Sequence, residues 1–302
     1  MNDSFDLLIF GDIVVDNFYE VNEIPEINKS AEVINHKRFY GGMGANTAVC
    51  ASALGLKTSF VGVVGSFGDE KECVSYMKER GVDIHLNVIL GETAHSMFFK
   101  KEKVHKFISF LHKGIAEKTD EIKIGKENIE LIKKTGAIFM PRTYLNLQKK
   151  VSMHCKNKFL IYNPGYGVFN FKKIPEDFYR ILKNTDVLVL NKHEYEWLKE
   201  RGFDFEFRMG PAAFLITKGS YGCKIFAKGI YEDIPKFKTK VVDTAGAGDA
   251  FNAGFIAGHL QGFNLIEAVK IGNATASFIV EKWGCQTNIP SWEGVMGRYE
   301  MM

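Results

Sequence analysis

The sequence predicts an α/β protein with a mainly parallel central sheet covered by helices on both faces. Short apolar runs rich in β-branched and aromatic residues alternate with segments that carry helix signals. This alternation is typical of strands that are buried on both sides and connected by helices. The composition agrees, because 46% hydrophobic and 25% charged residues in a chain of 302 are ordinary values for a globular protein.

Each element is predicted from a run of residues and the signals at its ends. Short apolar runs bounded by turn residues predict strands over 7–15, 59–64, 137–140, 159–162, 186–190 and 213–217. Helix patterns that end just before a glycine predict helices over 45–54, 70–80 and 194–201. A further strand at 240–242 is expected to precede a helix that extends through Gln261.

Two stretches interrupt the alternation of strands and helices. Residues 17–40 and 91–113 show strand patterns with no helix pattern inside them. We expect them to form a small antiparallel sheet that projects from the main domain. No internal repeat, low-complexity tract or proline-rich linker divides the chain. Residues 1–302 are therefore expected to form one domain with this appendage.

Charge and cysteine content exclude several classes of protein. Lys and Arg number 39 against 36 Asp and Glu, which is too balanced for a chain that wraps nucleic acid or binds an anionic membrane. A small-molecule partner is expected instead. The 5 cysteines contain no C-x-x-C pair, so neither a disulfide framework nor a zinc site is indicated. The acidic N-terminus and the lack of a long apolar stretch predict a cytoplasmic protein.

The strongest motif is the run DTAGAGD at 243–249, which is expected to open a helix. Four consecutive small residues let backbone N–H groups converge at the helix N-terminus, where the partial positive charge favours a phosphate or a developing oxyanion. Asp249 then lies in the first turn, where its carboxylate can accept a proton from an attacking hydroxyl. Spacing alone leaves a second interpretation open, in which Asp249 is only a favourable first-turn acid.

A second glycine cluster, GGMGAN at 41–46, also precedes a predicted helix. Glycines at this position allow the backbone to approach a ligand closely, and Asn46 offers both a donor and an acceptor to hydroxyl groups. The cluster does not match the dinucleotide fingerprint G-x-G-x-x-G, and the chain contains no G-x-x-x-x-G-K-[ST]. Taken alone, a glycine-rich helix cap explains it equally well.

Polar residues also follow three of the predicted strands. Asp12 and Asp16 follow the first apolar run, at the edge where α/β proteins bind ligands, although one of them could be a turn residue. Asn191 and Glu194 follow another strand, and they either position metal-bound water near phosphates or cap the next helix. The segment 217–222 suits the phosphates and base of a nucleotide, with a plain hairpin turn as the alternative.

Together these motifs resemble those of the ribokinase (PfkB carbohydrate kinase) family over essentially the whole chain. The cluster at 41–46 is similar to the N-terminal signature of the family and the run at 243–249 to its C-terminal signature. N-K-H-E at 191–194 resembles its N-x-x-E motif, and 216–222 resembles its nucleotide-binding strand and turn. Segments 271–280 and 284–288 look especially like archaeal nucleoside kinases of broad specificity.

The resemblance implies a ribokinase-like three-layer α/β/α domain whose small β-sheet is a lid, and a kinase that uses ATP and Mg²⁺. Asp249 would be the catalytic base. The anion hole would consist of the N–H groups of Ala245, Gly246, Ala247 and Gly248. The acceptor would contact Asp12, Asp16, Gly42 and Asn46. ATP would bind at Asn191, Thr217, Gly219 and Gly222, with Glu194 holding Mg²⁺ through water. Some members bind a monovalent cation such as K⁺, here at Asp243 and the loop around Gly284.

Three positions depart from ribokinase itself and bear on the acceptor. Val14 replaces a polar residue, Met43 replaces a lysine, and Arg142 replaces a glutamate that helps to read the sugar. Arg142 is expected either to reach an acidic or phosphorylated acceptor or to pair with a carboxylate at the surface. We expect the 5′-hydroxyl of a nucleoside as acceptor. The alternatives are a sugar kinase for fructose, ribose, a sugar acid or a sugar phosphate, and a non-catalytic nucleotide-binding regulator.

The lid carries two further expectations. Phe98, Phe99 and Phe107 either stack on the base of a nucleoside or pack within the lid. Because lid strands often pair between subunits in this family, a homodimer through the lid is also possible.

Overall fold

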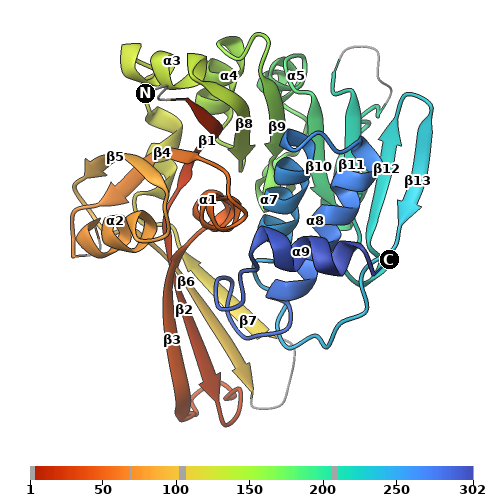
Figure 1. Ribbon diagram of the computed structural model, residues 1–302. Helices are drawn as coiled ribbons and strands as arrows, with labels where there is room; N and C mark the ends of the chain where they lie inside the picture. Colours follow the sequence, from red (N-terminus) through yellow and green to blue (C-terminus); the bar gives the residue numbers. More distant parts are fainter. Residues whose placement is uncertain (1–3, 69, 102–106, 206–209, 302) are drawn as a thin grey trace.

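The protein consists of a large sheet between two layers of helices and a smaller sheet that projects from one end (Figure 1). A computed structural model describes residues 4–68, 70–101, 107–205 and 210–301. Within them the large sheet has nine strands, in the spatial order β13 (Ile230–Ile234), β12 (Cys223–Ala227), β11 (Ala213–Thr217), β10 (Val187–Asn191), β9 (Phe159–Asn163), β8 (Thr135–Pro141), β1 (Phe5–Asp12), β4 (Thr58–Gly65) and β5 (Asp83–Ile89). Pairs from β11 to β5 are parallel, and β12 and β13 add an antiparallel edge. The predicted mainly parallel sheet is confirmed.

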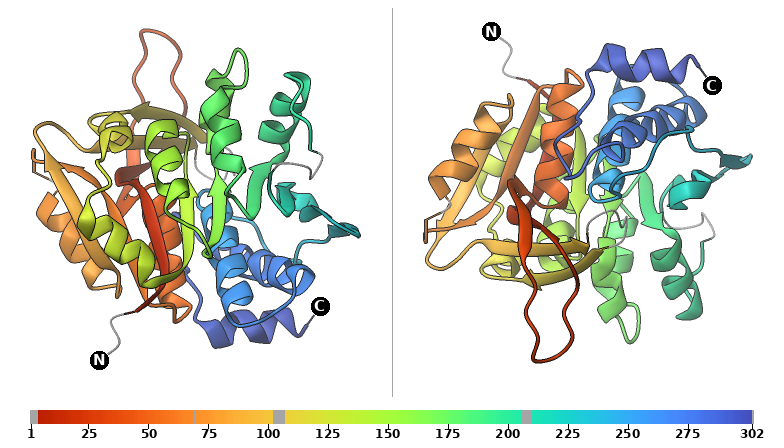
Figure 2. Two further views of the ribbon diagram at one scale, coloured as in Figure 1. Left: turned by 90° about the horizontal axis from the view of Figure 1, so that it is seen from above. Right: turned by 90° about the horizontal axis from the view of Figure 1, so that it is seen from below.

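Helices cover both faces of this sheet, which confirms the three-layer fold. One layer contains α1 (Met43–Ala53), α2 (Glu70–Lys78), α7 (Ala247–Leu260), α8 (Leu265–Ile279) and α9 (Trp292–Tyr299). The other contains α3 (Lys126–Lys133), α4 (Leu145–Met153), α5 (Glu176–Leu182) and α6 (Lys192–Glu200). Alternate side chains of β1 enter the two cores, Leu7 and Ile9 on one side and Leu8 and Phe10 on the other. Figure 2 shows α7, α8 and α9, in blue, across the sheet from the green helices.

Two strand predictions are wrong. The run 7–15 is not one strand, because β1 ends at Asp12 and a second strand, β2 (Val14–Val21), begins in the other sheet. Buried residues continue across this change of sheet, so the apolar run gives no signal of it. Residues 240–242 form no strand but an extended connection, in which the Val242 N–H donates to Val280 O at 2.7 Å. The other strands and the helices predicted for the central domain agree with the structure to within two residues at each end.

The small sheet, the lid, is formed by the two stretches that interrupt the alternation. Its strands lie in the order β3 (Val33–Gly41), β2, β6 (Ala94–Lys101) and β7 (Phe107–His112). The outer pairs are antiparallel, but β2 and β6 are parallel, so the prediction of an antiparallel sheet is wrong for the central pair. The reason is topological: β2 follows β1 and β6 follows β5, and these two strands leave the large sheet at the same edge.

That edge positions the functional residues. The parallel strands β1, β8, β10 and β11 end there, at Asp12, Pro141, Asn191 and Thr217, where open α/β sheets bind their ligands. The lid begins at the same edge, since β2 follows β1 after a single residue. Within the described residues, no helix combines the length and apolar character needed to cross a membrane.

Candidate active site

Asp249 lies in the first turn of α7, directly after the glycine-rich run. The N-cap of α7 is Gly246, whose φ of +78° is a left-handed conformation that glycine adopts without strain. A Cβ at this position would also lie 2.8 Å from the Cβ of Cys285. Asp249 Oδ2 accepts a hydrogen bond from Asn46 Nδ2 at 2.8 Å. The two glycine-rich motifs of the sequence therefore meet in one site.

The N-terminus of α7 presents backbone N–H groups to a ligand. The Ala250 N–H donates to Gly246 O at 3.0 Å, so the N–H groups that precede Ala250 have no partner within the helix. Gly248 is one of them, and a Cβ built on it would meet no atom within 4 Å. This end of the helix carries partial positive charge and is open to an anion on the side of Gly248.

Asp243 holds the loop that leads into α7. Its buried carboxylate accepts hydrogen bonds from the N–H groups of Ala245 and Gly284, both at 3.0 Å. The Ala245 N–H, which belongs to the predicted anion hole, therefore already has a partner in the Asp243 carboxylate. The Ala247 N–H also has a partner, since it donates to Thr244 O at 3.3 Å, so the backbone donors left from the predicted set are Gly246 and Gly248. Asp243 thus ties this loop to the loop that follows α8.

Two more carboxylates lie at the edge of the sheet, and both are buried. Asp12 ends β1 and accepts a hydrogen bond at Oδ1 from Arg142 Nε at 3.0 Å. Arg142 follows β8 with a φ of +65°, which is uncommon for a residue other than glycine. Asp16, in β2, is 4% exposed and accepts hydrogen bonds from the Ser96 side chain and the Gly42 backbone. The structure thus brings Asp12, Asp16 and Arg142 to the base of the lid.

The electrostatics of the site favour protonation of two carboxyl groups near neutral pH. Burial, together with the neighbouring charge of Asp249, raises the pKa of Asp16 to about 7, against the hydrogen bonds from Ser96 and Gly42 and the charge of Arg142. Burial also raises the pKa of Asp249 to about 7, against the hydrogen bond from Asn46 and the charge of Arg142, which both lower it. A carboxyl group with a pKa near the working pH can accept a proton and give it back.

The glycine cluster both begins α1 and lets the backbone approach Asp16. Gly42 is the N-cap of α1 with a φ of +97°. A Cβ on Gly41 would lie 2.4 Å from Asp16 Oδ2 and 2.6 Å from Asn46 Oδ1. The motif is therefore a helix cap, and its missing side chains also let Asp16 and Asn46 approach the backbone closely.

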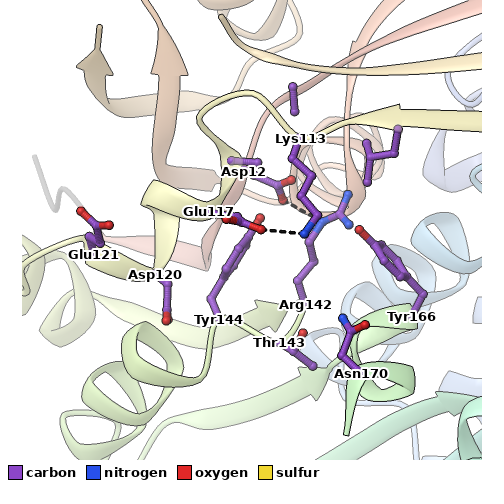
Figure 3. Close-up of a pocket in the computed structure, with 14 residues that line it drawn as sticks. Asp12, Lys113, Glu117, Asp120, Glu121, Arg142, Thr143, Tyr144, Tyr166 and Asn170 are labelled. Carbon is purple, nitrogen blue, oxygen red and sulfur yellow. Dashed lines mark hydrogen bonds and ion pairs between the residues drawn. The ribbon is translucent and has the colours of Figure 1, made fainter. Parts of the chain in front are cut away.

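A cavity of about 570 Å³ opens at the carboxyl ends of β1 and β8 (Figure 3). Charged, polar and aromatic side chains border it, among them Asp12, Lys113, Glu117, Asp120, Glu121, Arg142, Tyr144, Tyr166 and Asn170. Both cations at its border are paired, Arg142 with Asp12 and Lys113 with Glu117 at 2.6 Å. Arg142 does pair with a carboxylate as one expectation had it, but this carboxylate is buried in the site and does not lie at the surface.

A second cavity, of about 320 Å³, lies at the N-terminus of α7. It is bordered by the predicted nucleotide residues Thr217, Gly219 and Gly222, by Gly248 of α7, and by Asn273 of α8. Asn191 pairs with Thr217 across the sheet and so lies next to this lining. The segment 217–222 joins β11 to the antiparallel β12 through a 3₁₀ turn, so the hairpin alternative is present in the structure.

Asn191 and Glu194 form a reciprocal cap at the start of α6. The Glu194 N–H donates to Asn191 Oδ1 at 2.9 Å, and the Glu194 carboxylate accepts from the Asn191 N–H at 2.8 Å and from Asn191 Nδ2 at 2.6 Å. Burial raises the pKa of Glu194 to about 7. The capping alternative is thus present in the structure. Among the described residues there is no group of three His, Cys, Asp or Glu side chains that could hold a metal ion by themselves.

The lid phenylalanines pack on one another. Phe98 stacks on Phe18 with ring centroids 4.5 Å apart and meets Phe107 edge-on at 5.3 Å. Phe99 stacks on Tyr19 at 4.9 Å. Because successive side chains of a strand point to opposite faces, Phe99 lies on the face away from Phe98. The structure therefore agrees with packing within the lid.

One buried residue near Asp249 carries no prediction from the sequence. Gln286, in the loop after α8, donates from Nε2 to Asn46 Oδ1 at 2.7 Å and accepts at Oε1 from the Tyr76 hydroxyl at 2.7 Å. Gln286 and Asn46 are 240 positions apart, and no local pattern connects them. In the sequence analysis, residues 284–288 contribute only to the resemblance to archaeal nucleoside kinases.

The fold and these two cavities, one at Asp12 and Arg142 and the other at the start of α7, define a small-molecule kinase of the ribokinase fold. Residues 4–292 match the family described as pfkB family carbohydrate kinase, and the chain belongs to that family. It is an ATP-dependent phosphotransferase with an alcohol group as acceptor.

Individual relatives agree with this assignment. The chain is 32% identical over 298 residues to a nucleoside kinase of Methanocaldococcus jannaschii, covering 96% of this chain and 95% of that one. It is 26% identical over 301 residues to a ribokinase of Haemophilus influenzae, covering 94% and 95%. The crystal structure of the M. jannaschii nucleoside kinase, an archaeal member of the ribokinase family, superimposes with a TM-score of 0.87 at 29% identity over 99% of both chains.

Proposed function

We propose that the protein transfers the γ-phosphoryl group of ATP to the 5′-hydroxyl of a nucleoside, with Asp249 as the general base. The observation that carries this proposal is the place of Asp249. Its Oδ2 is held by Asn46 at 2.8 Å, it lies in the first turn of an open helix N-terminus, and that helix start lies beside the second cavity. Burial raises its pKa to about 7, which suits a base at neutral pH.

In the proposed step the acceptor oxygen attacks the γ-phosphorus while its proton passes to Asp249. The bond between the γ-phosphorus and the β,γ-bridging oxygen breaks, and ADP leaves with the electron pair of that bond. The N–H groups of Gly246 and Gly248 would stabilise the charge on the transferred group. Donors held in place for a transition state contribute about 3 kcal/mol each, and a positioned base contributes about 10²- to 10⁴-fold in rate. Positioning and electrostatics supply most of the catalysis in phosphoryl transfer.

The cavity at Asp12 and Arg142 supports a nucleoside as acceptor. Its volume of about 570 Å³ lies within the range of sites for ligands of this size, about 300 to 1,000 Å³. Tyr144 and Tyr166 border it and offer aromatic surface to a base, while Asp12 offers oxygen atoms to hydroxyl groups. Asp16, Gly42 and Asn46 would hold the ribose hydroxyls nearer to Asp249. Because both cations at the border are already paired, an anionic acceptor is less well matched.

A sugar kinase is the second candidate, supported by the similarity to a ribokinase over nearly the whole chain. It would use the same base and the same helix N-terminus on a smaller acceptor. A non-catalytic nucleotide-binding regulator has less support, because Asp249 and its partner Asn46 are in place.

The residues on the nucleotide side of the site are compatible with Mg²⁺, which would supply positive charge there. Mg²⁺ is usually held by one or two carboxylates together with phosphates and water, so it needs no complete cage of protein ligands. We propose that Glu194 holds it through water and that Asp243 contributes to a site for K⁺. The buried Asp243 oxygens lie between two loops and retain lone pairs beyond the bonds from Ala245 and Gly284. Bound Mg²⁺ would neutralise charge on the phosphates.

We also propose a homodimer through the lid. The strand β7 is at the edge of the lid and is exposed along its length, with Phe110 57% and Ile108 44% exposed. Light scattering after size exclusion tests this, and a monomer at micromolar concentration overturns it.

An acceptor screen tests the proposed function. Purified protein with Mg-ATP is offered nucleosides, ribose, fructose, fructose 6-phosphate and 2-keto-3-deoxygluconate, and ADP release is followed. The proposal expects the highest kcat/KM with a nucleoside. A response to sugars only would replace the acceptor and leave the mechanism intact. The absence of acceptor-dependent ADP release would overturn the proposed phosphoryl transfer to these acceptors, and full activity in Asp249→Ala would overturn Asp249 as its base.

A further inference from the structure

Gln286 contacts three elements, β3, α1 and α2, whose bonded residues lie 210 to 246 positions before it in the sequence. It is buried, with 9% of its surface exposed. Its Nε2 donates to Asn46 Oδ1 of α1 at 2.7 Å and to Tyr40 O of β3 at 3.3 Å, and its Oε1 accepts from the Tyr76 hydroxyl of α2 at 2.7 Å. Asn46 donates in turn to Asp249 of α7. The chain of bonds therefore ends on the proposed base.

The partners of Gln286 set the direction of every amide in this chain. The Tyr40 carbonyl can only accept, so the end of Gln286 that faces it must be the NH₂ group. The same NH₂ group faces Asn46, which must therefore present Oδ1 to Gln286 and Nδ2 to Asp249. The hydroxyl of Tyr76 then donates to the remaining oxygen of Gln286. Without Gln286, Asn46 has no such constraint and can turn its Oδ1 toward the carboxylate.

The orientation of Asn46 matters for Asp249 in two ways. A donated hydrogen bond favours the ionised form of the carboxylate, whereas two facing oxygen atoms would disfavour it. The bond to Oδ2 also fixes the rotation of the carboxyl group, so that Oδ1 is the oxygen left for the acceptor hydroxyl. The titratable and charged groups that act on Asp249, or on which it acts, are Asp12, Asp16, Cys50, Arg142 and Cys285. None of these groups holds the amide of Asn46.

We propose that Gln286 is a positioning residue for the base: it fixes the amide of Asn46 so that Asn46 donates to Asp249. Gln286 acts on Asp249 through Asn46. The hydroxyl of Tyr76 holds the other end of the Gln286 amide. This inference rests on the proposed role of Asp249 as general base. It adds the hydrogen bonds through Asn46 and Gln286 that keep the Asp249 carboxylate ionised and aligned.

The variants Gln286→Met and Gln286→Glu test the proposal on the full-length protein. Methionine keeps the length of the side chain without a donor, and glutamate keeps its shape but cannot donate to Asn46 or to the Tyr40 carbonyl. We measure kcat and KM from about pH 5.5 to about pH 9 with the best acceptor of the screen. In both variants the apparent pKa of the acidic limb of kcat should rise by about one unit, so that kcat below that limb falls about tenfold. The KM for ATP should stay within about twofold of the wild-type value, because Gln286 does not border the second cavity, where the nucleotide is proposed to bind.

Two tyrosine variants serve as a pair. Tyr76→Phe removes the hydroxyl that donates to Gln286 and should shift the acidic limb in the same direction by less. Tyr40→Phe removes the hydroxyl of the neighbouring ring, whose centroid is 5.5 Å away and whose partner is Glu72, and should leave the profile of the wild type. Tyr76→Phe also keeps the test available if substitutions of Gln286 prevent folding.

The outcomes separate this inference from the proposed function. An unshifted pH profile in Gln286→Met and Tyr76→Phe, with Asp249→Asn inactive, overturns the positioning role and leaves the base assignment. A loss of kcat by the same factor at every pH also overturns it, since a merely structural role predicts that result. Activity in Asp249→Asn overturns both. In an Asn46→Ala background, Gln286→Met should cause no further shift, because the two residues act in series.

Discussion

Arg142 Nε lies 3.0 Å from Asp12 Oδ1, and the Asp12 side chain is almost fully buried. The guanidinium sits over the ring of Tyr166, 5.5 Å from its centroid. Its charge also lowers the pKa of Asp16 and of Asp249, against the effect of burial. The Arg142 guanidinium therefore pairs with Asp12 and also favours the ionised forms of Asp16 and Asp249.

Arg142→Met is expected to destabilise the protein strongly. The substitution leaves the Asp12 carboxylate buried without its counter-charge, and removal of one partner of a buried ion pair typically costs about 3 to 5 kcal/mol. The free energy of unfolding in urea at neutral pH measures the loss. Adding Asp12→Asn to Arg142→Met should recover part of it, because the double variant buries no unpaired charge. Equal stability of the single variant and the wild type would contradict the role of this pair.

The free protein is expected to lose stability as the pH rises from about 4.5 to about 7. Burial raises the pKa values of Asp16, Asp249 and Glu194 to about 7 from ordinary values of 3.8 and 4.5. The folded state therefore binds more protons than the unfolded state in this pH window. Raising the pH removes those protons and lowers the free energy of unfolding. The variant Glu194→Gln isolates one group: its single amide oxygen keeps one of the two bonds from Asn191, and the loss of the other bond does not depend on pH. Its stability relative to the wild type should increase with pH, and a difference that is constant with pH would contradict the prediction.

Gly246→Ala is expected to lower both stability and kcat. Alanine at a φ of +78° costs about 1 to 2 kcal/mol, and its Cβ would in addition lie 2.8 Å from the Cβ of Cys285. Gly229→Ala is the matched control, because Gly229 has the same φ of +78° but a Cβ there would meet no atom within 4 Å. Gly246→Ala should cost more free energy of unfolding than Gly229→Ala and should alone reduce kcat. Equal losses of stability would show that only the backbone conformation matters.

The sequence predicts the layers and the place of Asp249 well, because these depend on local patterns. Apolar runs mark the buried strands, and the small residues before Asp249 mark a helix start. The chain passes from the large sheet to the lid near Ile13, and the sequence pattern does not show this change because the residues on both sides of Ile13 are buried. The parallel pairing of β2 with β6 depends on the direction in which both strands leave the large sheet, which no local pattern contains.

The hydrogen bonds of the site are harder to predict than its residues. The small residues before α7 indicated an anion hole, but the Asp243 carboxylate takes the N–H of Ala245. Arg142 was expected to lie at the surface or on the acceptor, yet it pairs with a buried carboxylate whose own side chain the sequence had placed on the acceptor. Gln286 acquires a role only through partners on three other elements. Such contacts depend on the completed fold.

The most direct test of the account is the turnover of Asp249→Asn, which keeps the shape of the side chain but cannot take a proton. We predict that kcat with Mg-ATP and the best acceptor falls about 10²- to 10⁴-fold, while the affinity for ADP measured by calorimetry changes by less than about threefold. A kcat within about tenfold of the wild type, with a native circular dichroism spectrum, would contradict the assignment of Asp249 as the base.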